Sequence, residues 1–316
     1  MAGTPPHEMI QDLEADGVIP TPFDLDQFIA QLAEQRGRRI RLSSFSAHPD
    51  APSGLVISTR GTDYILHART GSPFFRDHVI AHELGHLLLE HPGQPGCTDP
   101  GELLSGLMPH LDPALITRIL GRSTYTHAYA NARERDAEVF ATLMLAGRTT
   151  EKQWADGGAG LHQGRHRTPD DEACRRSLDR LAHLWATLTR AVPCVVLRTG
   201  DGHLLRHPVQ RLHRCLVEIN DALLVLAPYG GVHGAGAAEV RAFPAGVSAE
   251  HARAIVEAAG VSAPLGSYTG GDINGGFNAR TEEVSSLPTT LEYEVRRLEL
   301  LAYEVRAKPR TNALVR

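Results

Sequence analysis

Apolar residues recur at intervals of three and four along much of the chain, a spacing that predicts amphipathic helices. In the N-terminal half the pattern predicts a helix over 25–37, ended by Gly37, an apolar helix over 79–91 and a helix over 126–146. In the C-terminal half the same spacing predicts four helices, over 174–190, 209–226, 248–259 (ended by Gly260) and 288–306. The chain is therefore expected to be largely helical.

Short runs in which apolar and polar residues alternate predict strands before the apolar helix. The runs LVIST (55–59) and DYILH (63–67) flank a turn and so predict a hairpin, and RIRL (39–42) also alternates. The apolar segment 193–197 is a candidate strand. If one strand of the hairpin is an edge, it could hold a peptide substrate by strand addition; otherwise both strands belong only to the core.

Composition divides the chain into an α+β N-terminal domain and a mainly helical C-terminal module. The prolines and polar residues of 1–22 predict a flexible arm, and the domain follows over 23–147. Residues 148–172 are glycine-rich and polar, which is typical of a linker. A helical accessory domain is then expected over 173–316.

Charge, hydropathy and cysteine usage restrict the class of protein. The formal net charge of −5 and the pI of about 6.4 give no general attraction to nucleic acid. No run approaches the roughly 18 apolar residues of a membrane span, and the N-terminus lacks the pattern of a signal peptide. The four cysteines form no Cys-x-x-Cys pair, which argues against a cysteine zinc site and a disulfide framework. We therefore expect a cytoplasmic protein with reduced thiols that neither spans a membrane nor binds nucleic acid directly.

The most informative stretch is VIAHELGHLLLEH (79–91), which contains a His-Glu-x-x-His motif. Four residues span just over one helical turn, so His82 and His86 leave the same helix face, about 5–6 Å apart at Cβ. Two neutral imidazoles at this spacing can bind one Zn²⁺, and Glu83 would then be the general base toward a metal-activated water. A chance match in a chain with 17 histidines is the alternative. The apolar surroundings weaken it, because two histidines and a glutamate in a core helix are costly without partners.

One ligand is missing from this motif, because a catalytic zinc usually has three protein ligands and a water. Glu134, on the later helix, is the preferred third ligand, and Glu138 lies one turn further on the same face. Glu138 could accept the outward N–H of a ligand histidine. Asp136 is a competing candidate that lies about 200° around the helix from Glu134. The alternative interpretation is that residues 133–136 form an ordinary charged helix face.

The two motifs together, in this order, resemble the ImmA/IrrE family of metallopeptidases. That family has His-Glu-x-x-His and then Glu-x-Glu-Ala-x-x-Phe-Ala on a later helix, where this chain has ERDAEVFA from Glu134 onward. The chain departs from the family at Asp136, where a glutamate is common, and in having LMLA in place of Leu-Leu-Met-Pro. The resemblance covers roughly residues 25–146, less than half of the chain.

The resemblance implies a zincin-like fold with a gluzincin-like ligand set. In it His82, His86 and Glu134 match the ligands of a Zn²⁺ cofactor, and Glu83 matches the catalytic base. It further implies a zinc-dependent endopeptidase of regulatory type, whose partner is a protein substrate such as a helix-turn-helix transcriptional repressor. Two alternatives stay open: a metal-containing regulatory or toxin-type protein that acts by binding a partner, and a zinc hydrolase of a non-peptide substrate.

Two further features bear on the mechanism and on the C-terminal half. Tyr125, His127 and Tyr129 precede the helix of Glu134 and are candidate donors to the transition-state oxyanion, with ordinary loop placement as the alternative. Residues 211–229 resemble an uncharacterised helical domain, so we expect an accessory regulatory or partner-binding module.

Overall fold

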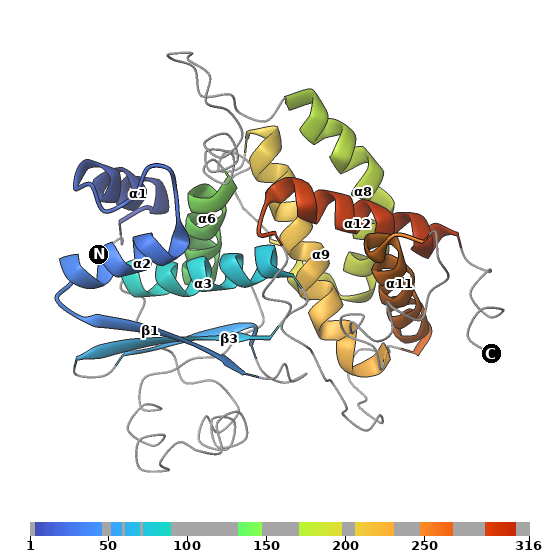
Figure 1. Cartoon of the computed structure of the whole chain (residues 1–316), viewed down its shortest axis with the longest axis horizontal. Helices are drawn as coiled ribbons and strands as arrows, with labels where there is room; N and C mark the ends of the chain where they lie inside the picture. The colour runs from blue at the N-terminus through green and yellow to red at the C-terminus, as the bar shows by residue number, and fades with distance from the viewer. Residues whose placement is uncertain are drawn as a thin grey trace, which may run out of the picture.

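A computed structural model places most of the predicted elements (Figure 1). The described residues are 4–45, 52–58, 61–69, 72–89, 132–146, 171–197, 206–230, 247–267 and 288–307. They form a mostly helical fold with one small sheet, which confirms the expected α+β class. The expected linker over 148–172 lies outside the described residues except for Asp171 and Glu172, which begin a helix.

The sheet has three strands in the order β1-β3-β2: β1 (Arg39–Phe45), β3 (Thr62–Ala68) and β2 (Gly54–Ser58). The central strand β3 is parallel to β1 and antiparallel to β2, with Leu55 opposite Leu66. The predicted hairpin is therefore present, and β2 lies at one edge of this sheet. Helix α3 (Pro73–Leu88) contacts both β2 and β3.

The start of the chain differs from the expectation. Helix α1 (Pro6–Ala15) buries Ile10 and Leu13 in the N-terminal core, so the prediction of a flexible arm over 1–22 is wrong for the described residues from 4 onward. The prolines misled the interpretation, because a proline in the first turn of a helix removes an N–H that has no partner there in any case. Pro6 occupies that position.

Capping residues fix where the next two helices begin. The side chain of Asp24 caps α2 (Leu25–Gln35), and that of Ser72 caps α3, each by accepting a hydrogen bond from a backbone N–H three residues on. The α2 helix ends close to the predicted stop, where Gly37 has a φ of 61° that favours glycine. The cap at Ser72 sets the start of the helix that carries the His-Glu-x-x-His motif.

The described residues of the C-terminal half form mainly long helices, as the periodicity predicts. These are α8 (Asp171–Ala191), α9 (Pro208–Gly230), α11 (Ala249–Ser267) and α12 (Leu291–Arg306). The predicted strand over 193–197 is wrong, because Pro193–Val195 forms a short 3-10 helix, η1. The predicted stop at Gly260 is also wrong, because α11 continues through it. No helix among the described residues is long and apolar enough to cross a membrane.

Helix α3 contributes to both hydrophobic core clusters of the described residues. Its later residues Ile80, Leu84 and Leu87 pack with α1, α2 and α6 (Ala132–Ala146) in the N-terminal core. Its first turn instead places Phe74 and Phe75 among the C-terminal helices. Figure 1 shows α3 extending from above the sheet toward α9. The two halves therefore share a helix through their cores and pack directly together.

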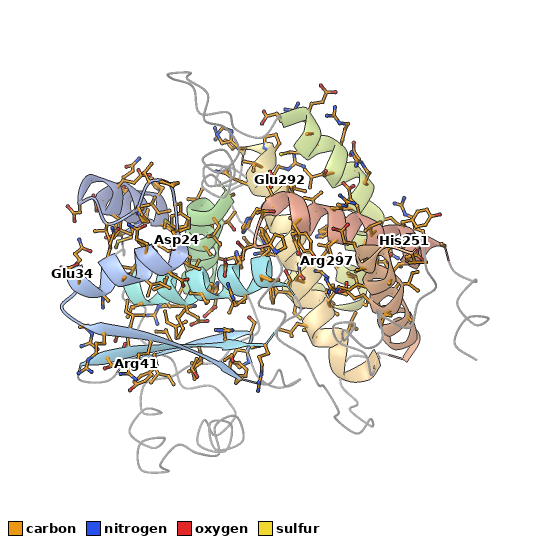
Figure 2. All side chains as sticks on the ribbon, in the orientation of Figure 1. Asp24, Glu34, Arg41, His251, Glu292 and Arg297 are labelled. Atoms are coloured by element: carbon orange, nitrogen blue, oxygen red, sulfur yellow. The ribbon has the colours of Figure 1, made fainter. Side chains whose placement is uncertain are left out.

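A buried ionic cluster lies within the C-terminal helices. Arg297 on α12 (Figure 2) donates to Glu294 and to Oδ1 of Asn220 on α9, each at 2.7 Å from Nη2. It also donates from Nη1 to Glu257 on α11 at 2.7 Å. One guanidinium thus joins three helices at a site from which water is largely excluded.

Candidate metal centre

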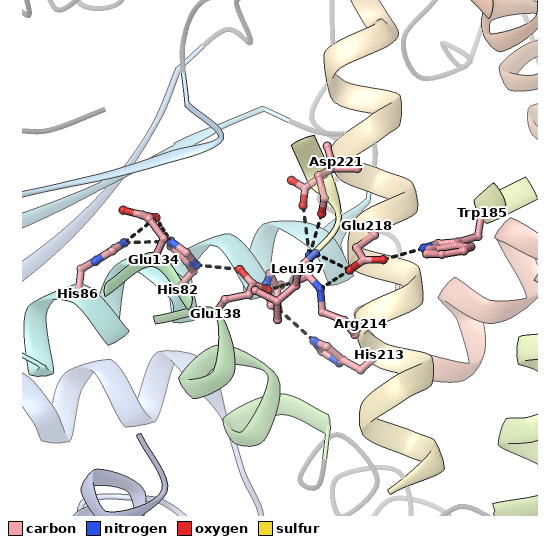
Figure 3. A network of polar contacts seen from close by, with 12 residues as sticks. His82, His86, Glu134, Glu138, Trp185, Leu197, His213, Arg214, Glu218 and Asp221 are labelled. Atoms are coloured by element: carbon pink, nitrogen blue, oxygen red, sulfur yellow. Dashed lines mark hydrogen bonds and ion pairs between the residues drawn. The ribbon is translucent and has the colours of Figure 1, made fainter. Parts of the chain in front are cut away.

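Three side chains from two helices meet at one point, as the sequence predicts. His82 and His86 on α3 and Glu134 on α6 offer ligand atoms that all lie within 4.8 Å of one another. The Nε2 atoms of His82 and His86 are 3.0 Å apart. Oε2 of Glu134 lies 3.4 Å from Nε2 of His82 and 3.3 Å from Nε2 of His86. Figure 3 shows all three side chains converging. The competing candidate Asp136 is not in this cluster.

The triangle of donor atoms fits a divalent cation. Two ligands bound at about 2.0–2.1 Å to a tetrahedral ion are roughly 3.4 Å apart. The three separations of 3.0, 3.4 and 3.3 Å are close to that value, so one ion can reach all three atoms at normal bond lengths. Two imidazoles and a carboxylate are ligands that catalytic zinc uses, with a fourth position left for water.

The glycine within the motif lets α3 and α6 approach closely. A Cβ added to Gly85 would lie 3.0 Å from Cα and 3.2 Å from the carbonyl oxygen of Ala137, in the backbone of α6. Only a glycine fits without moving one of the two helices. Gly85 therefore sets the distance across which Glu134 reaches the two histidines.

We predict that Gly85→Ala will push α6 away from α3. The added methyl group should lower the free energy of unfolding by about 1–3 kcal/mol, as overpacking does, and also weaken metal binding. Chemical denaturation and metal titration would measure the two effects. Gly61→Ala is the matched control, because nothing lies within 4 Å of its added Cβ. Unchanged metal affinity in Gly85→Ala would contradict the role of this contact.

Glu138 holds one of the histidines in place, as we expected from its position one turn after Glu134. Its Oε2 lies 2.9 Å from Nδ1 of His82, so this nitrogen carries the proton and donates it. The tautomer leaves the lone pair of Nε2 directed at the cluster. The other oxygen, Oε1, lies 2.6 Å from Nε2 of His78, one turn earlier on α3.

Charges within the cluster favour binding of a cation. Burial raises the pKa of Glu134, but the neighbouring imidazoles of His82 and His86 outweigh burial and hold that pKa well below its usual range. Burial lowers the pKa of His82, while the neighbouring carboxylates of Glu134 and Glu83 raise it overall. An ionised carboxylate beside two imidazole nitrogens thus attracts a positive charge.

Glu83 lies between the motif helix and the edge strand. Burial raises the pKa of its carboxyl group, against the charges of His86 and His82 and a hydrogen bond from the backbone of Val56 on β2. A Cβ on Gly54, also on β2, would lie 2.6 Å from Oε1 of Glu83. The edge strand therefore anchors this carboxylate and leaves room for it by means of a glycine.

Other residues singled out from the sequence are placed differently. Tyr125, His127 and Tyr129, the candidate oxyanion donors, lie outside the described residues. His213 on α9 is fully buried, and its Nε2 lies 3.1 Å from Nδ1 of His78. Burial, followed by the charges of Arg214 and His82, holds the pKa of His78 well below its usual value, so this imidazole is neutral at pH 7.

A polar network that was not predicted from the sequence extends from the cluster into the C-terminal helices (Figure 3). Arg214 on α9 donates from Nη1 to Oε1 of Glu138 and from Nε to Oε1 of Glu218, the latter at 3.1 Å. Glu218 also accepts from Nε1 of Trp185 at 2.6 Å and from the backbone N–H of Leu197 at 2.9 Å. One signal was available: the charged positions 214, 218 and 221 recur at intervals of four and three, which places them on one stripe of the helix.

Comparison with known proteins adds one finding, in the C-terminal half. A model described as a family of unknown function (DUF6545) matches residues 170–307, the segment that includes α8, α9, α11 and α12. No curated protein and no solved structure matches the chain. The C-terminal segment is thus similar to a family without an assigned activity, and the metal-ligand candidates lie before it, on α3 and α6.

Proposed function

We propose that this protein is a zinc-dependent endopeptidase of regulatory type, of the kind that the resemblance to the ImmA/IrrE family implies. The observation that carries the proposal is the meeting of His82, His86 and Glu134 at separations suited to one ion. The donor set favours zinc, because two imidazoles and one carboxylate form a common catalytic zinc site. When bound, the ion supplies an acidified water and polarises a carbonyl group.

Glu83 is the general base in this proposal. Its sequence position beside His82 and its anchoring to β2 keep the carboxylate near the ligand cluster. Burial raises its pKa above that of an exposed glutamate, which makes its carboxylate a better proton acceptor near neutral pH. It accepts the proton of the attacking water and can deliver it to the leaving amine.

The edge strand supports a peptide as the substrate. The backbone of β2 pairs with β3 on one side only within the described sheet, and it adjoins Glu83. An extended peptide that adds to the other side of β2 would lie alongside the general base. A regulatory protein with an exposed extended segment, such as a helix-turn-helix repressor, is the proposed substrate class.

The proposal is tested by measuring both the zinc content of the protein and its cleavage of peptides. We expect the purified chain to retain about one zinc per molecule after dialysis. Glu134→Ala should weaken zinc affinity by more than about 10–100-fold, the loss that follows removal of a residue that only hydrogen-bonds a metal ligand. Elemental analysis measures the metal, and mass spectrometry of a peptide library incubated with the protein detects new termini. Asp136→Ala is the matched control on the same helix.

Two results would overturn the proposal in different ways. Equal zinc content in Glu134→Ala and the unchanged chain would remove Glu134 from the ligand set. Zinc binding without any zinc-dependent cleavage of peptides or of helix-turn-helix proteins would remove the peptidase activity and leave a metal-containing binding protein.

A further inference from the structure

A buried arginine of the C-terminal half contacts the carboxylate that holds a metal-ligand candidate. Arg214 donates to Oε1 of Glu138, whose Oε2 lies 2.9 Å from Nδ1 of His82. Arg214 is 5% exposed and Glu138 is 2% exposed. A single carboxylate therefore separates a guanidinium on α9 from an imidazole of the metal cluster, and solvent does not intervene.

Among the described residues, Arg214 is the only arginine or lysine that forms an ion pair with Glu138. Glu138 accepts hydrogen bonds from His82 and from the neutral His78, and neither imidazole needs to carry a charge to donate. A buried carboxylate without a cationic partner would lose several kcal/mol of solvation. Arg214 supplies the positive charge and reaches the Oε1 atom, which leaves Oε2 free for the imidazole.

Arg214 is itself fixed from the C-terminal side. Its Nε donates to Glu218 at 3.1 Å, one helical turn further on α9. Glu218 is in turn held by Trp185 on α8 and by the backbone N–H of Leu197. The guanidinium thus has a defined position that is set by two helices of the segment matched by the family of unknown function.

We infer that Arg214 is a positioning residue of the metal centre, and that metal affinity depends through it on the C-terminal domain. The inference rests on the proposed metal centre. It assigns residues 170–307, which match the family of unknown function, a role in positioning a metal ligand. Glu138 orients the ring of His82 and strengthens its basicity, and Arg214 fixes Glu138. Partners of this kind are worth about 10–100-fold in metal affinity when removed.

The test compares substitutions at this position by zinc affinity, measured in competition with a chromophoric chelator. Arg214→Met and Arg214→Gln remove the charge and should weaken zinc binding by about 10–100-fold. Arg214→Lys keeps the charge and should stay within a few-fold of the unchanged chain. If Arg214→Met does not fold, the lysine and glutamine variants, matched in size, decide the question: equal affinities in these two would overturn the inference.

Two controls separate positioning from general stability. Arg297→Met removes another buried guanidinium of the same helical domain, away from the cluster, and should leave zinc affinity unchanged although the fold loses stability. In a Glu138→Gln background, Arg214→Gln should have little further effect, because the two residues act in series. Additive effects would show that Arg214 acts by another route.

The outcomes also distinguish this inference from the proposed function. If the unchanged chain binds no zinc, the proposed metal centre fails. If it binds zinc and the Arg214 variants bind it equally well, only the role of Arg214 fails.

Discussion

Replacing Glu83 by glutamine should lower the rate of peptide cleavage by a factor of about 10²–10⁴, the range that a positioned general base contributes. Glutamine has the same shape and keeps an oxygen that can accept the N–H of Val56 on β2. It has no carboxylate to accept a proton from water. The zinc content should stay that of the unchanged chain, because the ligand atoms of His82, His86 and Glu134 are untouched.

The pH dependence gives a second readout of the same residue. A general base works only when deprotonated, so activity should fall as pH drops through the pKa of Glu83. Burial raises that pKa, which shifts the acid limb of the kcat/KM profile above the range of an ordinary glutamate. A Glu83→Gln protein that retains full activity, with zinc bound, would show that another group accepts the proton.

Replacing Arg297 by methionine should produce a large loss of stability. The guanidinium joins Glu294, Glu257 and Asn220 within the C-terminal helices. Glu294 is 0% exposed, so without the arginine its charge has no solvent to compensate it. Breaking a buried ion pair from one side costs about 3–5 kcal/mol, a large part of the roughly 5–15 kcal/mol that stabilises a typical protein.

Urea denaturation followed by circular dichroism would measure this loss. The matched control is Arg180→Met, which removes an arginine whose pair with Glu299 on α12 is solvent-accessible, with the Arg180 side chain 56% exposed. Exposed pairs contribute about 0–1 kcal/mol, so this variant should unfold close to the unchanged chain. Equal losses in the two variants would mean that burial does not determine the strength of the Arg297 cluster.

Much of the candidate site could be predicted because its geometry is local. The spacing of His82 and His86 fixes their common face within one helix, whatever the rest of the chain does. Glu134 and Glu138 follow from the same rule on a second helix, once a third ligand and a partner for an outward N–H are required. Only the observation that α3 and α6 face each other required the three-dimensional structure.

Arg214 and His213 could not be assigned in the same way. They contact Glu138 and His78, residues 76 and 135 positions away in the sequence, so no local period links them. Periodicity identifies the apolar face of α9, but a polar residue on a helix is by default assigned to water. Here the polar stripe of α9 faces α3 and α6 of the same chain and not water. Only the packing of these three helices reveals this.

The sharing of α3 between two cores has a consequence for the order of events during translation. Phe74 and Phe75 leave the ribosome early, but the helices that cover them, from residue 171 to residue 306, are synthesised later. Until then these two rings lack the helices with which they pack in the complete chain, and incompletely covered apolar surface of this kind favours aggregation. The His-Glu-x-x-His motif is thus made before the helices that complete its surroundings, so that a prematurely terminated polypeptide would carry the motif without them.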